Sequence, residues 1–234
     1  MYSSAFCKVY NEFGWNYFPE AFGEQLLQWL RQQNITVRSS LDLGCGTGVL
    51  CEILHAQGIE AAGMDLSDGM IAIARERNPS IHYDVADMVT YRPDRRFDLV
   101  TCTGDALNHI ERMEDIGQIF RNVYDCLNDG GYFIFDLLNE AEIPSSEPID
   151  LDFSDTVKAR FRITRDEDGR IHLRTATYEN GVFQFEEDIV EVLHDPDAIC
   201  NLLKESGFSA IQRAHHLLEE SPGEATTWYV VVQK

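Results

Sequence analysis

The sequence predicts an α/β fold, a doubly wound and mostly parallel sheet with helices on both faces, together with a small antiparallel β insertion. Three observations predict it. Short apolar segments typical of strands alternate with amphipathic segments typical of helices from residue 20 to residue 138. A glycine-rich turn joins the first of these strands to its helix. From residue 151 onward the pattern changes to hairpins, in which polar and apolar residues alternate.

The alternating elements can be placed in order along the chain. We expect helices over residues 20–33, 48–57, 67–78 and 112–127. We expect strands over residues 40–43, 59–64, 81–85, 97–103 and 132–138. Ser67 can cap the helix that it opens, and Asn128 to Gly131 are expected to end the last of these helices. The strands that start at Phe97 and Tyr132 are almost continuously apolar, as expected for strands covered on both faces.

The chain after residue 138 follows a different pattern. Residues 139–150 are rich in Pro, Ser and Glu and are expected to form a loop. Residues 151–193 are expected to form three antiparallel strands with turns at 166–169 and 179–181, where Asn-Gly is a strong hairpin signal. The expected elements that remain are a helix over residues 195–207 and a hairpin of residues 208–218 with 225–233.

The charge of the chain limits its partners. Its 19 Lys and Arg residues are outnumbered by 40 Asp and Glu residues, which gives a formal net charge of −21. Nucleic-acid binding depends on cationic groups that neutralise phosphates, so a nucleic-acid partner is disfavoured and a small molecule or a protein is favoured. No apolar run is long enough to span a membrane and no signal peptide is visible, which predicts a cytoplasmic protein without a membrane partner. The scattered cysteines match neither a metal site nor a disulfide framework.

The glycine-rich turn is the sequence Leu-Asp-Leu-Gly-Cys-Gly-Thr-Gly at residues 41–48. It lies at the carboxyl end of the first strand, where open α/β sheets bind ligands, and glycine lets the backbone approach a ligand closely. A dinucleotide fingerprint would need glycine or alanine at position 49, where Val49 stands. A tight strand–helix turn without a ligand is the alternative for the glycines alone.

Acidic residues follow the next two strands. Asp65 ends the second strand, 17 residues after Gly48, where a carboxylate can accept both hydroxyls of a ribose; alternatively it caps the helix near Ser67. Residues 84–88 end the third strand, where a carboxylate and a backbone amide can bind the edge of an adenine. The fourth strand leads into residues 103–109.

Taken in order, these four segments resemble the class I S-adenosylmethionine-dependent methyltransferases, over residues 10–233. The resemblance implies a Rossmann-like seven-stranded sheet in the order 3-2-1-4-5-7-6 with the last strand antiparallel. It also implies one methyltransferase domain over residues 1–234. Residues 1–33 would then be an N-terminal helical lid, and the insertion at 151–193 a substrate lid or a contact between two subunits of a homodimer.

The same resemblance implies S-adenosyl-L-methionine as cofactor, with S-adenosyl-L-homocysteine as product. The residues that would bind it are Asp42, Gly44, Cys45, Gly46, Thr47, Asp65, Leu66, Met70, Asp87, Met88 and Thr103. The glycine turn and Asp42 would border the methionine part, and Asp65 would hold the ribose. No metal is implied.

The remaining members of this set would hold the other parts of the cofactor. Leu66 and Met70 would lie beside the adenine, Asp87 and Met88 would bind its edge, and Thr103 would face the sulfonium. Methyl transfer is an in-line displacement that depends mainly on alignment and desolvation, so no catalytic triad is expected. A base is needed only if the acceptor arrives protonated.

Three features narrow the resemblance. The segment with Tyr10 and Tyr17 resembles that of small-molecule methyltransferases, and the segment with His109 resembles that of the glycine and amino-sugar N-methyltransferases. The insertion at 151–193 resembles that of the amino-sugar and related enzymes. The resemblance implies a small-molecule acceptor, methylated on nitrogen or oxygen and held by Tyr10, Tyr17 and His109 as the catalytic residues. Alternatively the tyrosines only pack the first helix, His109 only caps the next one, and the insertion is structural. The alternative functions are a protein or RNA methyltransferase and a cofactor-binding protein without turnover, as a monomer or a homodimer.

Overall fold

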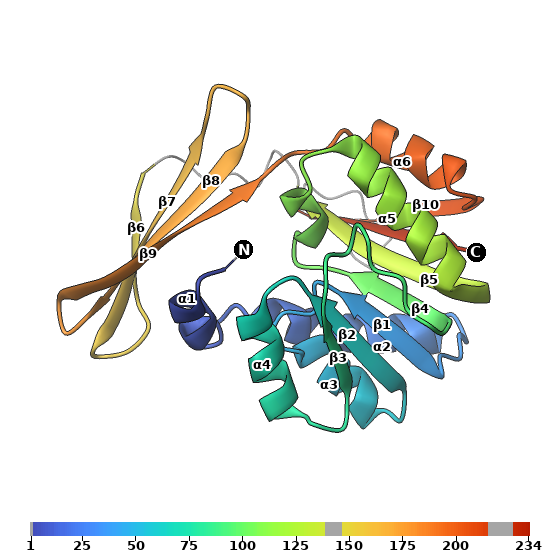
Figure 1. The fold of residues 1–234 in the computed structure, drawn as a ribbon, viewed down its shortest axis with the longest axis horizontal. Helices are drawn as coiled ribbons and strands as arrows, with labels where there is room; N and C mark the ends of the chain where they lie inside the picture. Colours follow the sequence, from blue (N-terminus) through green and yellow to red (C-terminus); the bar gives the residue numbers. More distant parts are fainter. Residues whose placement is uncertain (1, 139–146, 215–226) are drawn as a thin grey trace.

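The computed structural model describes residues 2–138, 147–214 and 227–234, and a seven-stranded sheet lies at its centre (Figure 1). Its strands are β1 (Ser39–Leu43), β2 (Glu60–Asp65), β3 (His82–Val85), β4 (Phe97–Cys102), β5 (Leu127–Leu138), β10 (Ala210–Ala214) and β11 (Thr227–Gln233). Their order is β3-β2-β1-β4-β5-β11-β10. The first five are parallel, and β11 is antiparallel to both β5 and β10. The predicted order 3-2-1-4-5-7-6 is confirmed.

Helices cover both faces of this sheet. They are α1 (Ser4–Val9), α2 (Tyr17–Gln32), α3 (Val49–Ala56), α4 (Asp68–Arg77), α5 (Met113–Cys126) and α6 (Pro196–Glu205), with one 3-10 turn, η1 (Ala106–His109). The apolar side chains of α5 and α6 form one core with one face of the strands, and those of α2, α3 and α4 form a second core with the other face. Among the described residues no helix is both long and apolar enough to cross a membrane.

Local capping explains where two of the helices begin. The Ser67 side chain accepts a hydrogen bond from the Met70 amide at 3.3 Å, so Ser67 caps α4 as predicted. Asp195 caps α6 in the same way. A difference appears after α5, because residues 128–131 belong to β5 and are not a separate turn. The reason is a distant partner: Lys234 exchanges backbone hydrogen bonds with Gly130 and Gly131.

A second sheet lies beside the central one and is entirely antiparallel, in the order β6-β7-β8-β9 (Figure 1). Its strands are β6 (Ile149–Asp152), β7 (Val157–Arg165), β8 (Ile171–Glu179) and β9 (Val182–Glu191). Three strands were expected, and β6 is the addition. Every residue of β6 is exposed, and ion pairs such as Asp150–Arg160 join it to β7, so no burial pattern marks it in the sequence. Residues 139–146 of the expected loop and 215–226 of the expected final hairpin lie outside the described residues.

The N-terminal segment packs against the second sheet. Figure 1 shows α1 between this sheet and α4. Phe6 and Phe13 are buried against Ala159, Phe161 and Ile189 of the sheet. An antiparallel sheet with one apolar face needs that face covered, and residues of the N-terminal segment provide the cover.

Candidate active site

A cavity of about 680 Å³ lies between the carboxyl ends of the central strands and the second sheet. Its walls come from the central sheet, the N-terminal segment and strands β7 to β9. Ten of the eleven expected cofactor residues line it: Asp42, Gly44, Cys45, Gly46, Thr47, Asp65, Leu66, Asp87, Met88 and Thr103. The eleventh, Met70, is fully buried in α4 and does not line the cavity.

The three residues expected to hold the acceptor do not all meet. Tyr10 and His109 line the cavity. Tyr17 does not, because it begins α2 with its side chain 74% exposed. The next residue, Phe18, faces the cavity instead, and Trp15 joins it. A helix turns by about 100° per residue, so the neighbour of an exposed residue can point inward.

The glycine turn is fastened to the end of β2. The amides of Gly44 and Cys45 both donate to the Met64 carbonyl, at 2.8 and 2.9 Å. Gly46 has a φ of 52°, and a Cβ there would meet no atom within 4 Å, so its backbone is open to the cavity. Gly48 has a φ of 78°, and a Cβ there would lie 2.5 Å from the Tyr83 hydroxyl oxygen. These hydrogen bonds and glycine conformations determine the shape of the turn.

Asp65 links the turn to the start of α4. Its Oδ2 accepts from the Gly46 amide at 2.9 Å, and its Oδ1 accepts from the Ser67 amide at 2.8 Å. Each carboxylate oxygen keeps a further lone pair, which a hydroxyl in the cavity can use. Burial raises the pKa of Asp65, and the two amide bonds oppose that rise.

Asp42 is the most buried carboxylate of the cavity wall. It lies opposite Thr101 in the pairing of β1 with β4, and its Oδ1 accepts from the Thr101 hydroxyl at 2.7 Å. Burial raises the pKa of Asp42 to about 7. A cation bound beside Asp42 would favour its charged form.

A loop held by Asp136 carries the residues after β4. Asp136 is fully buried in β5 and accepts from the amides of Gly104 and Asp105, at 3.0 and 3.2 Å. Asp105 has a φ of 58° and lines the cavity, and burial raises its pKa to about 6. Sequence reasoning missed Asp136, although an aspartate within the apolar run of residues 132–138 was a signal for it.

His109 ends η1 and is oriented by the second sheet. Its Nδ1 lies 3.2 Å from the Val190 carbonyl oxygen. A carbonyl can only accept, so we assign the proton of the neutral ring to Nδ1, which leaves Nε2 with a free lone pair. Nε2 lies 4.0 Å from Oε1 of Glu191. Burial lowers the pKa of His109 and raises that of Glu191 to about 7.

Aromatic residues of the N-terminal segment form another wall. Tyr2, Tyr10 and Trp15 line the cavity, and the Tyr2 ring meets the His109 ring edge-on at 6.2 Å between centroids. Burial raises the pKa of both tyrosines, so their hydroxyls stay protonated. Sequence reasoning missed Tyr2 and Trp15; the density of aromatic residues before the first helix was the available signal.

Side-chain contacts hold this segment in place at two points. The Thr47 hydroxyl of the glycine turn donates to the Asn11 side chain at 3.0 Å. The amide and the hydroxyl of Ser3 both donate to the Glu187 carboxylate on β9, at 2.9 and 2.6 Å. The N-terminal segment therefore bridges the glycine turn and the second sheet.

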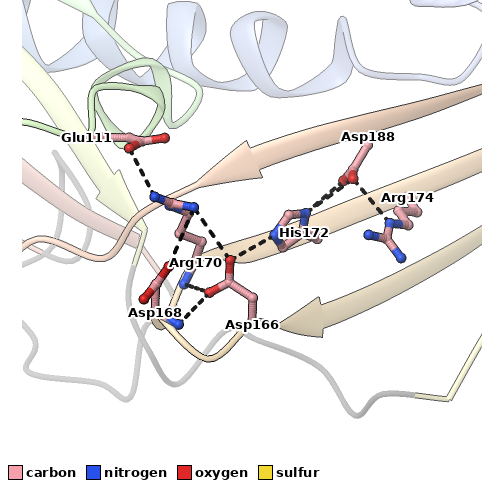
Figure 2. Close-up of polar contacts among 7 residues, drawn as sticks. All are labelled: Glu111, Asp166, Asp168, Arg170, His172, Arg174 and Asp188. Atoms are coloured by element: carbon pink, nitrogen blue, oxygen red, sulfur yellow. Dashed lines mark hydrogen bonds and ion pairs between the residues drawn. The ribbon is translucent and has the colours of Figure 1, made fainter.

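The second sheet is joined to the rim of the cavity. The side-chain Nδ2 of Asn108 in η1 donates to the Val192 carbonyl at 2.7 Å. The backbone carbonyl of Asn108 accepts from the Val192 amide at 2.8 Å. Arg170, in the turn between β7 and β8, pairs with Glu111 at 3.5 Å (Figure 2). These contacts keep the sheet over the cavity.

Known proteins share this domain. Residues 41–131 match the family model described as a methyltransferase domain. A protein of Geobacillus sp. (strain WCH70), provisionally named a methyltransferase, is 26% identical over 250 residues, which are 97% of this chain and 95% of that protein. The dTDP-4-amino-2,3,4,6-tetradeoxy-D-glucose N,N-dimethyltransferase of Saccharopolyspora spinosa is 29% identical over 112 residues, 48% of this chain and 45% of that enzyme.

A solved structure has the same fold. It is that of SAM-bound CalS10, an amino pentose methyltransferase from Micromonospora echinaspora. The TM-score is 0.75 with 18% identity, over 100% of this chain and 98% of that one. The strand order, the glycine turn and the carboxylates at the strand ends are those of the class I methyltransferase fold. The chain therefore has the fold of the S-adenosylmethionine-dependent methyltransferases of this class.

Proposed function

We propose that the chain transfers the methyl group of S-adenosylmethionine to a nitrogen of a small-molecule acceptor. One observation carries the proposal: the glycine turn, Asp65 and the free Nε2 of His109 share one cavity with aromatic walls. The relatives support nitrogen, because one is named an N,N-dimethyltransferase and another an amino pentose methyltransferase.

The residues present suit this cofactor. The open backbone at Gly46 leaves room for the methionine part, and Asp42 can stabilise its cationic amino group. Asp65 has lone pairs left for the ribose hydroxyls. Leu66 and Met88 offer apolar contact to an adenine. When bound, the cofactor supplies an electrophilic methyl carbon on a sulfonium.

The chain's own residues would prepare the acceptor. An ammonium acceptor has no lone pair, and Nε2 of His109 can take its proton. The lone pair freed on the acceptor nitrogen would be the nucleophile for the methyl group that the cofactor would supply, with the cofactor sulfur as the leaving group. Tyr2, Tyr10 and Trp15 would exclude water and place ring faces near the cationic centre.

A macromolecular acceptor is less consistent with this site. The cavity is covered by the N-terminal segment and the second sheet, both held by side-chain contacts. A protein tail or an RNA base would have to displace one of them.

The experiment is a panel of small amines and alcohols incubated with the protein and S-adenosylmethionine. Formation of S-adenosylhomocysteine, with a methylated amine found by mass spectrometry, is the expected result. Tight cofactor binding without turnover of any panel member, or methylation of alcohols alone, would contradict transfer to nitrogen.

A further inference from the structure

The ionisable side chains that line the cavity are mostly carboxylates. Eight carboxylate residues line the cavity: Asp42, Asp65, Asp87, Asp105, Glu111, Glu187, Asp188 and Glu191. Among the described residues no lysine or arginine lines it, and His109 is the one titratable base. Asp42, Asp65 and Asp87 are needed for the cofactor, so the other five belong to the acceptor half.

The segments outside the described residues contribute no lysine or arginine. Residues 139–146 and 215–226 contain neither lysine nor arginine. All 19 cationic side chains therefore belong to the described part of the chain, and none of them reaches the cavity wall.

The cations at the rim already have carboxylate partners. Arg170 pairs with Glu111 at 3.5 Å and with Asp166 and Asp168 at 3.8 Å each. Figure 2 shows this arginine surrounded by the three carboxylates. Farther along β8, Arg174 donates to Asp188 at 3.1 Å, and Asp188 also contacts His172. A phosphate bound by either arginine would have to compete with these carboxylates.

The backbone amides of α5 and of the glycine turn offer no substitute. A helix N-terminus can bind phosphate through free amides, but α5, which begins next to the rim, carries Glu114 and Asp115 in its first turn. The glycine turn gives its amides to Met64 and Asp65 and belongs to the cofactor half.

We propose that the acceptor carries no phosphate or other anionic group and is a free amine, cationic in solution, with an apolar body. This inference rests on the proposed transfer to nitrogen. Phosphate recognition uses arginine, lysine or free amides, and the acceptor half has carboxylates in their place. Ile163, Leu173 and Ile189 of the second sheet give the apolar body its contact. A dTDP-linked amino sugar, the compound in the name of the Saccharopolyspora relative, is thereby excluded as acceptor.

A matched pair of acceptors tests the inference. One is dTDP-4-amino-2,3,4,6-tetradeoxy-D-glucose, and the other is the methyl glycoside of the same amino sugar. We expect kcat/KM to be about a hundred-fold higher for the methyl glycoside. Calorimetry with dTDP alone, on protein loaded with S-adenosylhomocysteine, should detect no binding. Equal turnover of the two sugars, or submillimolar binding of dTDP, would overturn the proposal.

Charge variants test the reason for it. Glu111→Arg replaces a carboxylate at the rim by a cation and removes one of the three carboxylate partners of Arg170, so it should gain dTDP binding by about ten-fold or more. Glu76→Arg makes the same change of charge at an exposed side chain of α4 that does not line the cavity, and should gain none. Equal binding by the two variants would refute the electrostatic argument.

The two proposals fail in different ways. If the protein binds the cofactor but methylates no amine, transfer to nitrogen is wrong, while the dTDP titration still decides whether the cavity rejects phosphate. If amines are methylated and dTDP also binds, only the present inference falls.

Discussion

The Nδ1 atom of His109 lies 3.2 Å from the carbonyl oxygen of Val190, so a strand of the second sheet determines which nitrogen of this ring carries the proton. Val190 belongs to β9 of the second sheet, and His109 ends η1, which follows β4 of the central sheet. The second sheet thus orients the proposed base as well as covering the cavity.

Replacing His109 by alanine should lower kcat by about ten-fold or more and leave the affinity for S-adenosylhomocysteine nearly unchanged. The proposed base acts on the acceptor and not on the cofactor. Steady-state kinetics with an amine that the wild type methylates would measure kcat, and calorimetry would measure the affinity for S-adenosylhomocysteine. His82→Ala, at a side chain 72% exposed on β3, is the control. Full activity in His109→Ala would show that His109 is not the base.

The pH profile of kcat/KM should follow the same ring. Burial lowers the pKa of His109 below its ordinary value of 6.5, so the neutral, active form persists as the pH falls to that value and is lost only below it. We expect an acidic limb below pH 6.5 in the wild type. The amine acceptor is fully protonated across this range and adds no inflection there. The His109→Gln variant should lack the limb, and a limb that persists would have to come from another group.

Most of the cavity wall that we propose to bind the cofactor could be predicted, because its residues follow recognisable strands directly in the sequence. The glycine turn, Asp65 and Asp87 each follow a strand directly, and the carboxyl ends of parallel strands meet at one edge of the sheet. Met70 was placed by the family resemblance, and the structure buries its side chain completely in α4. The position of Met70 around the axis of α4 therefore places its side chain in the interior and not at the cavity.

The acceptor half was harder to predict because its contacts join distant parts of the chain. Tyr2 lies beside His109, and the adjacent Ser3 is bound by Glu187, 184 residues away along the chain. Strand β6 has no buried position that could mark it. Tyr17 fits the family's motif by spacing, but the first turn of α2 directs Phe18 inward instead. None of these outcomes follows from local propensity.

Asp65→Ala should weaken cofactor binding by about 1.5–3 kcal/mol, because two ribose hydroxyls would lose a charged acceptor. Asp65→Asn should lose less, since the amide oxygen can still accept from Gly46 or Ser67. Calorimetry with S-adenosylhomocysteine measures both. Asp68→Ala, at an exposed position in the first turn of α4, serves as the control. Equal affinity in Asp65→Ala and the wild type would show that Asp65 does not hold the ribose.

Asp42 should make the protein less stable as the pH rises. Its pKa is about 7 in the folded state and near 3.8 when unfolded, so its contribution is complete below 3.8 and is lost as the pH rises through about 7. Asp42→Asn cannot ionise and can still accept from Thr101. Between about pH 5 and about pH 8, the Tm of the wild type should fall more than that of Asp42→Asn. Parallel curves for the two, with exposed Asp94→Asn as reference, would contradict the buried charge.

Glu187→Ala should loosen the N-terminal segment, because Ser3 would lose both of its hydrogen bonds to the second sheet. Trypsin should then cleave faster after Lys8, an exposed residue of α1. Glu186→Ala alters the exposed neighbour on the same strand and should leave the cleavage rate unchanged. Identical rates in both variants would mean that Phe6 and its apolar contacts alone hold the segment.

The most direct test of methyl transfer to nitrogen is a reaction with S-adenosylmethionine carrying ¹³C in its methyl group, using the methyl glycoside of the amino sugar as acceptor. The ¹³C chemical shift of the product separates an N-methyl from an O-methyl group. The wild type should give an N-methyl signal. The His109→Ala variant should give the same signal at a rate that is lower by about ten-fold or more. An O-methyl signal, or label that stays on the cofactor while the cofactor binds tightly, would contradict the proposal.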